Sequence, residues 1–119
     1  MKVAALQMVS TPRVEDNLAA AHRLIAQAAA QGCELAVLPE YFCLMGQRES
    51  DKVAVREAPG EGPIQSFLAA AAREHGLWLV GGTLPLAAGD EARVRNTSLA
   101  FSPLGECVAR YDKIHLFRF

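Results

Sequence analysis

The chain has no cluster of positive charge. Its 119 residues include 12 Lys and Arg against 13 Asp and Glu, which gives a formal net charge of -1. Binding to nucleic acid or to an anionic membrane surface calls for clustered Lys and Arg side chains. We therefore expect no nucleic acid and no membrane among the partners, and we expect a small molecule or another protein instead.

Long apolar runs and paired cysteines are also missing. No run approaches the roughly 20 apolar residues that cross a bilayer, and Gln7 ends the first short run without the cleavage site of a signal peptide. The three cysteines, Cys33, Cys43 and Cys107, are an odd number and have neither CxxC nor metal-ligand spacing. This usage is typical of a reducing compartment, so we expect a cytoplasmic protein.

The chain contains no internal repeat and no low-complexity segment. Hydrophobic residues make up 51% of it, which excludes disorder and is enough for one core. Residues 114–119 are mostly apolar and carry no turn, cap or polar tail, although natural termini usually lie at the surface. We therefore expect residues 1–119 to be one partial domain, truncated at its carboxyl end.

The first 40 residues have the pattern of a βαβ unit. Residues 3–8, apolar apart from Gln7, predict a strand, and the hydroxyls of Ser10 and Thr11 can cap the helix whose apolar positions recur from Val14 until Gly32. Residues 35–38 predict a second strand, parallel to the first. Because this second strand is entirely apolar, we expect it to be buried on both faces by helices.

A second helix and a third strand follow a polar segment. Residues 46–61 are charged and predict a surface loop. The next helix is expected to begin at Pro63 and to end at Gly76, because proline suits a first turn and glycine a terminus. Residues 77–80 then predict a third buried strand. The fold class is therefore α/β.

Helical spacing disappears after this strand, and short strands with turns replace it. Residues 84–87 and 93–101 predict a hairpin. Residues 102–105 read SPLG, which favours a type I turn. Residues 107–111 predict the next strand, which leads into residues 112–117.

Glu40 is the first candidate site residue, because it follows the apolar strand at residues 35–38 directly. Open α/β sheets bind ligands at the carboxyl ends of their strands. A surface carboxylate at the start of a loop is the plain alternative, and this segment alone does not decide between them. Gly81 and Gly82 end the next strand at the same edge, where glycine permits close approach or simply a tight bend.

Three segments, taken together and in order, resemble the nitrilase superfamily of carbon-nitrogen hydrolases. They are residues 38–42 (LPEYF), 96–106 (NTSLAFSPLGE) and 111–117 (YDKIHLF); Gln7 and residues 81–83 (GGT) also fit. The resemblance covers the whole chain. It implies the amino-terminal part of a nitrilase-like αββα sandwich.

The resemblance also implies a Glu-Lys-Cys catalytic set. Glu40 matches the general base, and Lys113 matches the lysine that stabilises the oxyanion or donates a proton. The matching cysteine is expected beyond residue 119, so this chain alone is expected to be inactive. A carboxylate can take the thiol proton, and a fixed ammonium can stabilise the charge that grows on the carbonyl oxygen. We expect Glu40 and Lys113 to lie within hydrogen-bonding distance.

Other candidates have ordinary structural explanations beside the functional ones. Tyr41 and Phe42 are candidate substrate-binding residues, and core packing explains aromatic residues there equally well. Cys43 is close to Glu40 in sequence, but a small buried hydrophobe is the more common role of a free cysteine. The three histidines lack metal-ligand spacing, so we expect no metal and no cofactor.

The whole protein is therefore expected to hydrolyse a small amide through a thioester. The segment at residues 111–117 resembles most the branch with deaminated-glutathione amidases and ω-amidases. A nitrilase or an N-carbamoyl amidohydrolase is the alternative within enzymes, and a non-catalytic α/β binding domain or a pseudoenzyme is the alternative outside them. The resemblance implies a homo-oligomer, and an isolated fragment is expected to associate through its exposed sheet edges.

Overall fold

The computed structural model describes residues 1–46, 48–89 and 93–113. The described residues form six strands and three helices, with the helices confined to the first two thirds of the chain. In order they are β1 (Val3–Ala5), α1 (Val14–Ala30), β2 (Leu35–Val37), α2 (Glu49–Ala54), α3 (Pro63–His75), β3 (Trp78–Val80), β4 (Leu84–Ala87), β5 (Val94–Phe101) and β6 (Cys107–Asp112). The predicted α/β class is confirmed. Within the described residues, no helix is both long enough and apolar enough to cross a bilayer.

All six strands form one mixed sheet. β1, β2 and β3 are parallel neighbours, so the predicted βαβ unit is confirmed. β5 is antiparallel to β3 and β4, which both pair with it, and the predicted hairpin of β4 and β5 is present. β6 pairs with residues 97–101 of β5, a stretch that also pairs with β3 and β4. β6 therefore lies along the edge of β5 that faces away from β3 and β4.

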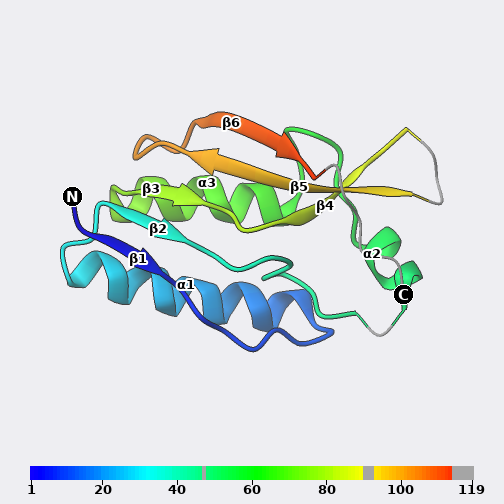
Figure 1. Ribbon diagram of the computed structural model, residues 1–119, viewed down its shortest axis with the longest axis horizontal. Coiled ribbons are helices and arrows are strands. Elements are labelled where there is room, and N and C mark those ends of the chain that lie inside the picture. Colours follow the sequence, from blue (N-terminus) through cyan, green and yellow to red (C-terminus); the bar gives the residue numbers. More distant parts are fainter. Residues whose placement is uncertain (47, 90–92, 114–119) are drawn as a thin grey trace.

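The two long helices cover the same face of the sheet. α1 packs against α3, and in Figure 1 both lie behind the strands. Successive crossovers of one hand that step in one direction along a sheet leave their helices on one side. The expectation that β2 is buried on both faces is therefore wrong.

The uncovered face of the sheet is apolar. Ala36 and Leu79 are neighbours in register and are fully buried toward the helices. On the opposite face Val3, Val37 and Trp78 remain 56%, 36% and 43% exposed. Side chains alternate between the two faces of a sheet, so this second face is built from every other residue of the same strands.

Two local expectations are corrected by the structure. The polar segment 46–61 contains the short helix α2, although the sequence predicts a loop there. Thr11 does not cap α1, because the first residue before that helix is Arg13, which has no side-chain cap. Instead, the Thr11 hydroxyl accepts a hydrogen bond from the Arg13 backbone N–H. Residues 114–117 of the last predicted segment lie outside the described residues.

A buried carboxylate holds the start of α3. The Glu57 side chain, 6% exposed, accepts hydrogen bonds from the backbone N–H groups of Ile64 at 2.6 Å and Gln65 at 3.0 Å. The first N–H groups of a helix have no partner within the helix, and their partial positive charge favours an anion. Gly62 lies against this carboxylate, since a Cβ at that position would come within 2.3 Å of Glu57 Cδ.

The exposed apolar face generates the first prediction. We expect the 119-residue chain expressed alone to self-associate, because a contiguous apolar face of this kind lowers its free energy by leaving water. Trp78→Lys should shift the chain toward monomer in size-exclusion chromatography with light scattering.

Ala70→Lys is the matched control, because Ala70 is exposed on α3, on the helical side of the sheet. It should leave the association unchanged. A wild-type chain that stays monomeric at high concentration would contradict the prediction.

Candidate active site

Glu40 is positioned by a tight contact between two loops. It lies three residues beyond the end of β2, and Gly82 lies two residues beyond the end of β3. Gly82 has φ 56°, and a Cβ there would come within 1.9 Å of the Pro39 carbonyl oxygen. Only glycine therefore lets the two loops approach this closely. The prediction that Gly81 and Gly82 lie at the same edge as Glu40 is confirmed.

Glu40 and Lys113 meet although 73 residues separate them in the chain. Lys113 Nζ donates a hydrogen bond to Glu40 Oε1 at 2.8 Å, which confirms the predicted contact. The Lys113 backbone N–H also donates to the carbonyl oxygen of Asn96 at 2.8 Å. The lysine is thereby fixed at the point where the chain leaves β6.

Asn96 is the third member of this cluster. Its Nδ2 donates to Glu40 Oε1 at 3.0 Å, and the residue is 5% exposed on β5. Within the described residues its Oδ1 has no hydrogen-bond partner. A buried, unpaired acceptor costs free energy, so Asn96 holds Glu40 at some expense to stability. It also presents an acceptor beside the carboxylate.

These contacts keep Glu40 ionised. The hydrogen bond from Lys113, and then that from Asn96, lower the pKa of the Glu40 carboxyl below its ordinary value. Burial acts in the opposite direction and is outweighed. Near neutral pH the site therefore contains a carboxylate that can accept a proton and an ammonium that can donate one.

The two aromatic residues after Glu40 have different environments. Tyr41 is half-buried in the left-handed region at φ 49°, and its N–H donates to Thr83 Oγ1 at 2.8 Å. Lys52 Nζ lies 4.4 Å from the centroid of the Tyr41 ring, a cation–π distance. Phe42 is fully buried in the core. The geometry favours Tyr41 over Phe42 for contact with a substrate, and that role stays a prediction for both.

Cys43 is unsuited to nucleophilic attack. It is fully buried, and burial raises the pKa of its thiol to about 12. A thiol with this pKa stays protonated at neutral pH, whereas the nucleophile must be a thiolate. Cys33 is half-buried and Cys107 is exposed on β6.

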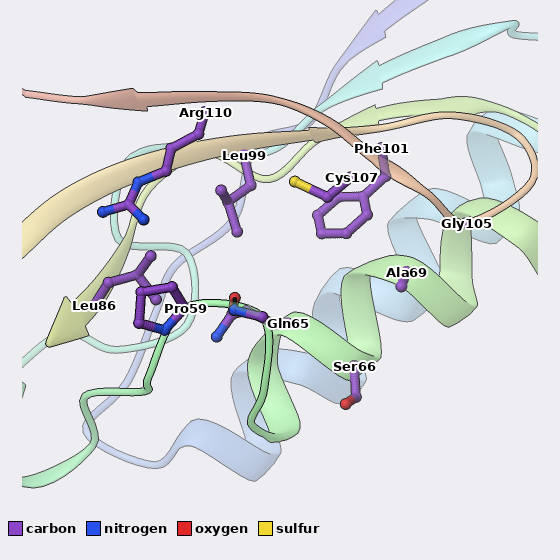
Figure 2. Close-up of a pocket in the computed structure, with 11 residues that line it drawn as sticks. Pro59, Gln65, Ser66, Ala69, Leu86, Leu99, Phe101, Gly105, Cys107 and Arg110 are labelled. Carbon is purple, nitrogen blue, oxygen red and sulfur yellow. Dashed lines mark hydrogen bonds between the residues drawn. The ribbon is translucent and has the colours of Figure 1, made fainter.

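A cavity of about 350 Å³ lies apart from these residues, between α3 and strands β4 to β6 (Figure 2). Its wall is mostly apolar, with Leu86, Leu99 and Phe101 on the sheet side and Arg110 and Cys107 on β6. Neither Glu40 nor Lys113 lines it. The Arg110 guanidinium is paired with Asp112 at 3.1 Å.

Sequence reasoning missed two functional positions. Asn96 falls within a segment that carries the family resemblance, but nothing in the sequence indicates that its amide reaches Glu40. Gly82 was expected at the correct edge, yet its contact with Pro39 depends on how two loops pack. Among the described residues, His22, Glu74 and His75 form a cluster that could hold a metal ion.

The sequence matches a known family over nearly its whole length. Residues 2–118 match the profile of the family described as carbon-nitrogen hydrolase. The deaminated glutathione amidase of Synechocystis is 37% identical over 115 residues, which are 96% of this chain and 42% of that protein. Omega-amidase NIT2-B of Xenopus laevis is 32% identical over 116 residues, covering 98% of this chain and 41% of its own length.

Solved structures agree with this result. One is a variant of the amidase from Nesterenkonia sp. AN1 that shows Michael addition of acrylamide at the active site cysteine. It is 29% identical with a TM-score of 0.85, and the match covers 99% of this chain and 46% of that one. The fold is thus that of nitrilase-superfamily amidases. The chain spans less than half the length of the relatives it matches.

Replacing Lys113 should raise the pKa of Glu40. In Lys113→Met the largest cause of the lowered pKa is gone, so carboxyl ¹³C titration by NMR should give a value closer to that of ordinary glutamate. Because the folded-state pKa lies below the unfolded one, the contact stabilises the fold above the ordinary glutamate pKa. That stabilisation is lost as pH falls through the folded-state pKa.

Lys52→Met is the matched control for this titration, since Lys52 acts on Glu40 only by a weaker charge effect. It should raise the pKa of Glu40 less than Lys113→Met does. An equal rise in both variants would contradict the assigned cause.

Gly82→Ala should displace the loop that carries Glu40. The added methyl group meets the Pro39 carbonyl, so we expect it to destabilise the fold by about 1 to 3 kcal/mol more than Gly89→Ala in urea unfolding. Gly89 also has a positive φ, 80°, but among the described residues no atom lies within 4 Å of the position a Cβ would take there. The two variants therefore share the backbone strain and differ only in the clash. Equal destabilisation would show that the contact with Pro39 is unimportant.

Proposed function

The chain belongs to the carbon-nitrogen hydrolase family, and we propose that it forms the part of an amidase that supplies two members of a Glu-Lys-Cys catalytic set. Glu40 is the general base, and Lys113 stabilises the oxyanion or donates a proton. The observation that supports this assignment best is the 2.8 Å contact between Lys113 Nζ and Glu40 Oε1 across 73 residues of chain. A carboxylate and an ammonium held together at a sheet edge can serve amide hydrolysis by a thiol as base and as oxyanion stabiliser.

The third member is a cysteine that we place beyond residue 119. The relatives are more than twice as long as this chain, and one neighbour is described as having an active site cysteine. Within the chain, the elevated pKa of Cys43 argues against that residue as the nucleophile. The 119-residue chain alone should therefore not turn over substrate.

The proposed reaction begins when Glu40 takes the proton of the cysteine thiol. The thiolate attacks the amide carbon, and the negative charge that forms on the carbonyl oxygen is stabilised by the Lys113 ammonium. The intermediate collapses with release of ammonia or an amine, which takes up the proton that Glu40 received from the thiol, directly or through Lys113, so that Glu40 is a carboxylate again. Glu40 then takes a proton from a water molecule, which attacks the thioester and frees the acid and the thiol.

Asn96 is proposed to position the base. The Asn96 Nδ2 and the Lys113 ammonium both donate hydrogen bonds to Oε1 of Glu40. Oε2 accepts none from the described residues. That second oxygen is thus the one proposed to receive the proton. Two donors on one oxygen also restrict rotation of the carboxylate, which fixes the position of the other oxygen.

The proposed substrate is a small amide of the kind that the names of the relatives indicate. Deaminated glutathione amidase and omega-amidase are the names of the two relatives described above. We further propose a cytoplasmic homo-oligomer that needs no cofactor. Nitrile hydrolysis and N-carbamoyl hydrolysis are the alternatives that a substrate panel must distinguish.

Activity of the full-length protein tests the proposal. Hydrolysis of deaminated glutathione should be measured by the free amine that it releases, and hydrolysis of small primary amides, a nitrile and an N-carbamoyl amino acid by the release of ammonia. Glu40→Gln and Lys113→Met should each lower kcat/KM by roughly 100-fold or more, because each removes a charge needed at the transition state.

Glu61→Gln is the matched control, since Glu61 is exposed near the start of α3 and has no contact with the site. It should keep full activity. Binding of an amide without turnover by the wild-type protein would instead favour the non-catalytic alternative.

A further inference from the structure

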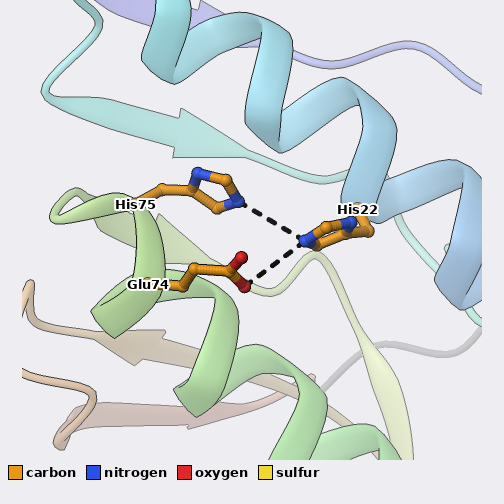
Figure 3. Close-up of side chains that lie close together, drawn as sticks. All are labelled: His22, Glu74 and His75. Carbon is orange, nitrogen blue, oxygen red and sulfur yellow. Dashed lines mark hydrogen bonds and ion pairs between the residues drawn. The ribbon is translucent and has the colours of Figure 1, made fainter.

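A second polar cluster lies between the two long helices. His22 comes from α1, and Glu74 and His75 come from the last turn of α3 (Figure 3). His22 Nε2 lies 3.4 Å from His75 Nε2 and 3.4 Å from Glu74 Oε2. One ligand atom from each residue lies within 4.8 Å of the other two. None of these residues contacts Glu40, Lys113 or Asn96 in the described structure.

The spacing of these atoms fits a bound metal ion. Two ligands that each lie about 2.05 Å from a tetrahedral Zn²⁺ are separated from one another by about 3.3 Å. The two separations from His22 Nε2, 3.4 Å each, match this edge length, and the separation between the Glu74 and His75 ligand atoms is no more than 4.8 Å. We propose that His22, Glu74 and His75 form a site for a divalent transition metal ion, with Zn²⁺ as the favoured occupant.

The chemistry of the ligands supports this choice. Neutral imidazole nitrogen is a preferred ligand of zinc and the neighbouring first-row metals, and a carboxylate supplies a third ligand and a negative charge. Magnesium and calcium prefer oxygen ligands, so they should bind weakly here. Three protein ligands leave a fourth position for water or for a donor from another molecule.

The site is both accessible and partly preformed. The side chains of His22 and Glu74 are 44% and 61% exposed, so an ion can reach them from solvent. The ring of His22 packs edge-on against Phe67, with ring centroids 6.4 Å apart, which restricts its orientation. Both histidines come from packed helices that share one core. Their approach therefore does not depend on a loop.

A bound ion would link α1 to α3. The protein's two longest helices each contribute to the site, so an ion that binds only the folded state stabilises their packing. This role is structural and independent of the proposed hydrolysis. It would secure the helical layer on the opposite side of the sheet from the exposed apolar face.

The competing explanation is a plain hydrogen bond between two neutral imidazoles. That arrangement needs an N–H on one Nε2 and a lone pair on the other, whereas metal binding needs a lone pair on both. The two explanations differ in what zinc does to the protein. Only a metal site binds Zn²⁺ with saturation and gains stability from it.

Isothermal titration of the full-length, tag-free and metal-stripped protein with ZnCl₂ tests the proposal. We expect saturation at about one ion per chain and a thermal midpoint that rises on the order of 5 °C when zinc exceeds its Kd by about 100-fold. His22→Gln and His75→Gln should each weaken zinc binding by about 100-fold or more. MgCl₂ should give neither effect.

Two control variants test whether other histidine or cysteine side chains account for the zinc binding. His115→Gln removes the third histidine, and a combined Cys33→Ser and Cys107→Ser variant removes the two thiols outside the core. Both should retain zinc binding. Unfolding curves in EDTA should confirm that every variant folds. No saturable binding, or binding unchanged in His22→Gln, would overturn the proposal.

Discussion

The candidate site depends on the pairing of β5 with three other strands. β5 contributes Asn96 to the site and, through the Asn96 carbonyl, holds the backbone of Lys113. The same strand accepts the Gly81 N–H at the Leu99 carbonyl, which anchors the loop next to Glu40. A shift of one residue in this register would turn each side chain to the other face of the sheet. The contact between Glu40 and Lys113 is thus a product of the sheet as a whole.

Much of this arrangement could be predicted from the sequence. Helices α1 and α3 and the parallel strands have strong local patterns, because apolar spacing and glycine termini act over a few residues. The uncovered sheet face could not be predicted in this way, since an entirely apolar strand looks the same whether one or two layers of helix cover it. The sequence does not predict α2, because this helix of six mostly polar residues is too short to show an apolar periodicity.

The candidate site is predictable from the sequence where a charged residue of suitable chemistry stands at the end of a predicted strand, and less so elsewhere. The contact between Glu40 and Lys113 is predictable because each residue follows a strand within a segment that resembles a family. Asn96 and the contact of Gly82 with Pro39 depend on distances between loops and strands that no local pattern encodes. For the same reason, the separation of His22 and His75 along the chain does not indicate that the packing of α1 against α3 brings them together.

The loop after β2 sacrifices some stability at Tyr41. A bulky side chain at φ 49° is strained, and glycine or asparagine would relieve that strain. The tyrosine nevertheless remains, held by Thr83 through its backbone and by Lys52 across its ring. A glycine at this position would relieve the strain but would lack the ring and its contact with Lys52. Position 41 is therefore one where an engineered gain in stability should be weighed against a loss in what the loop does.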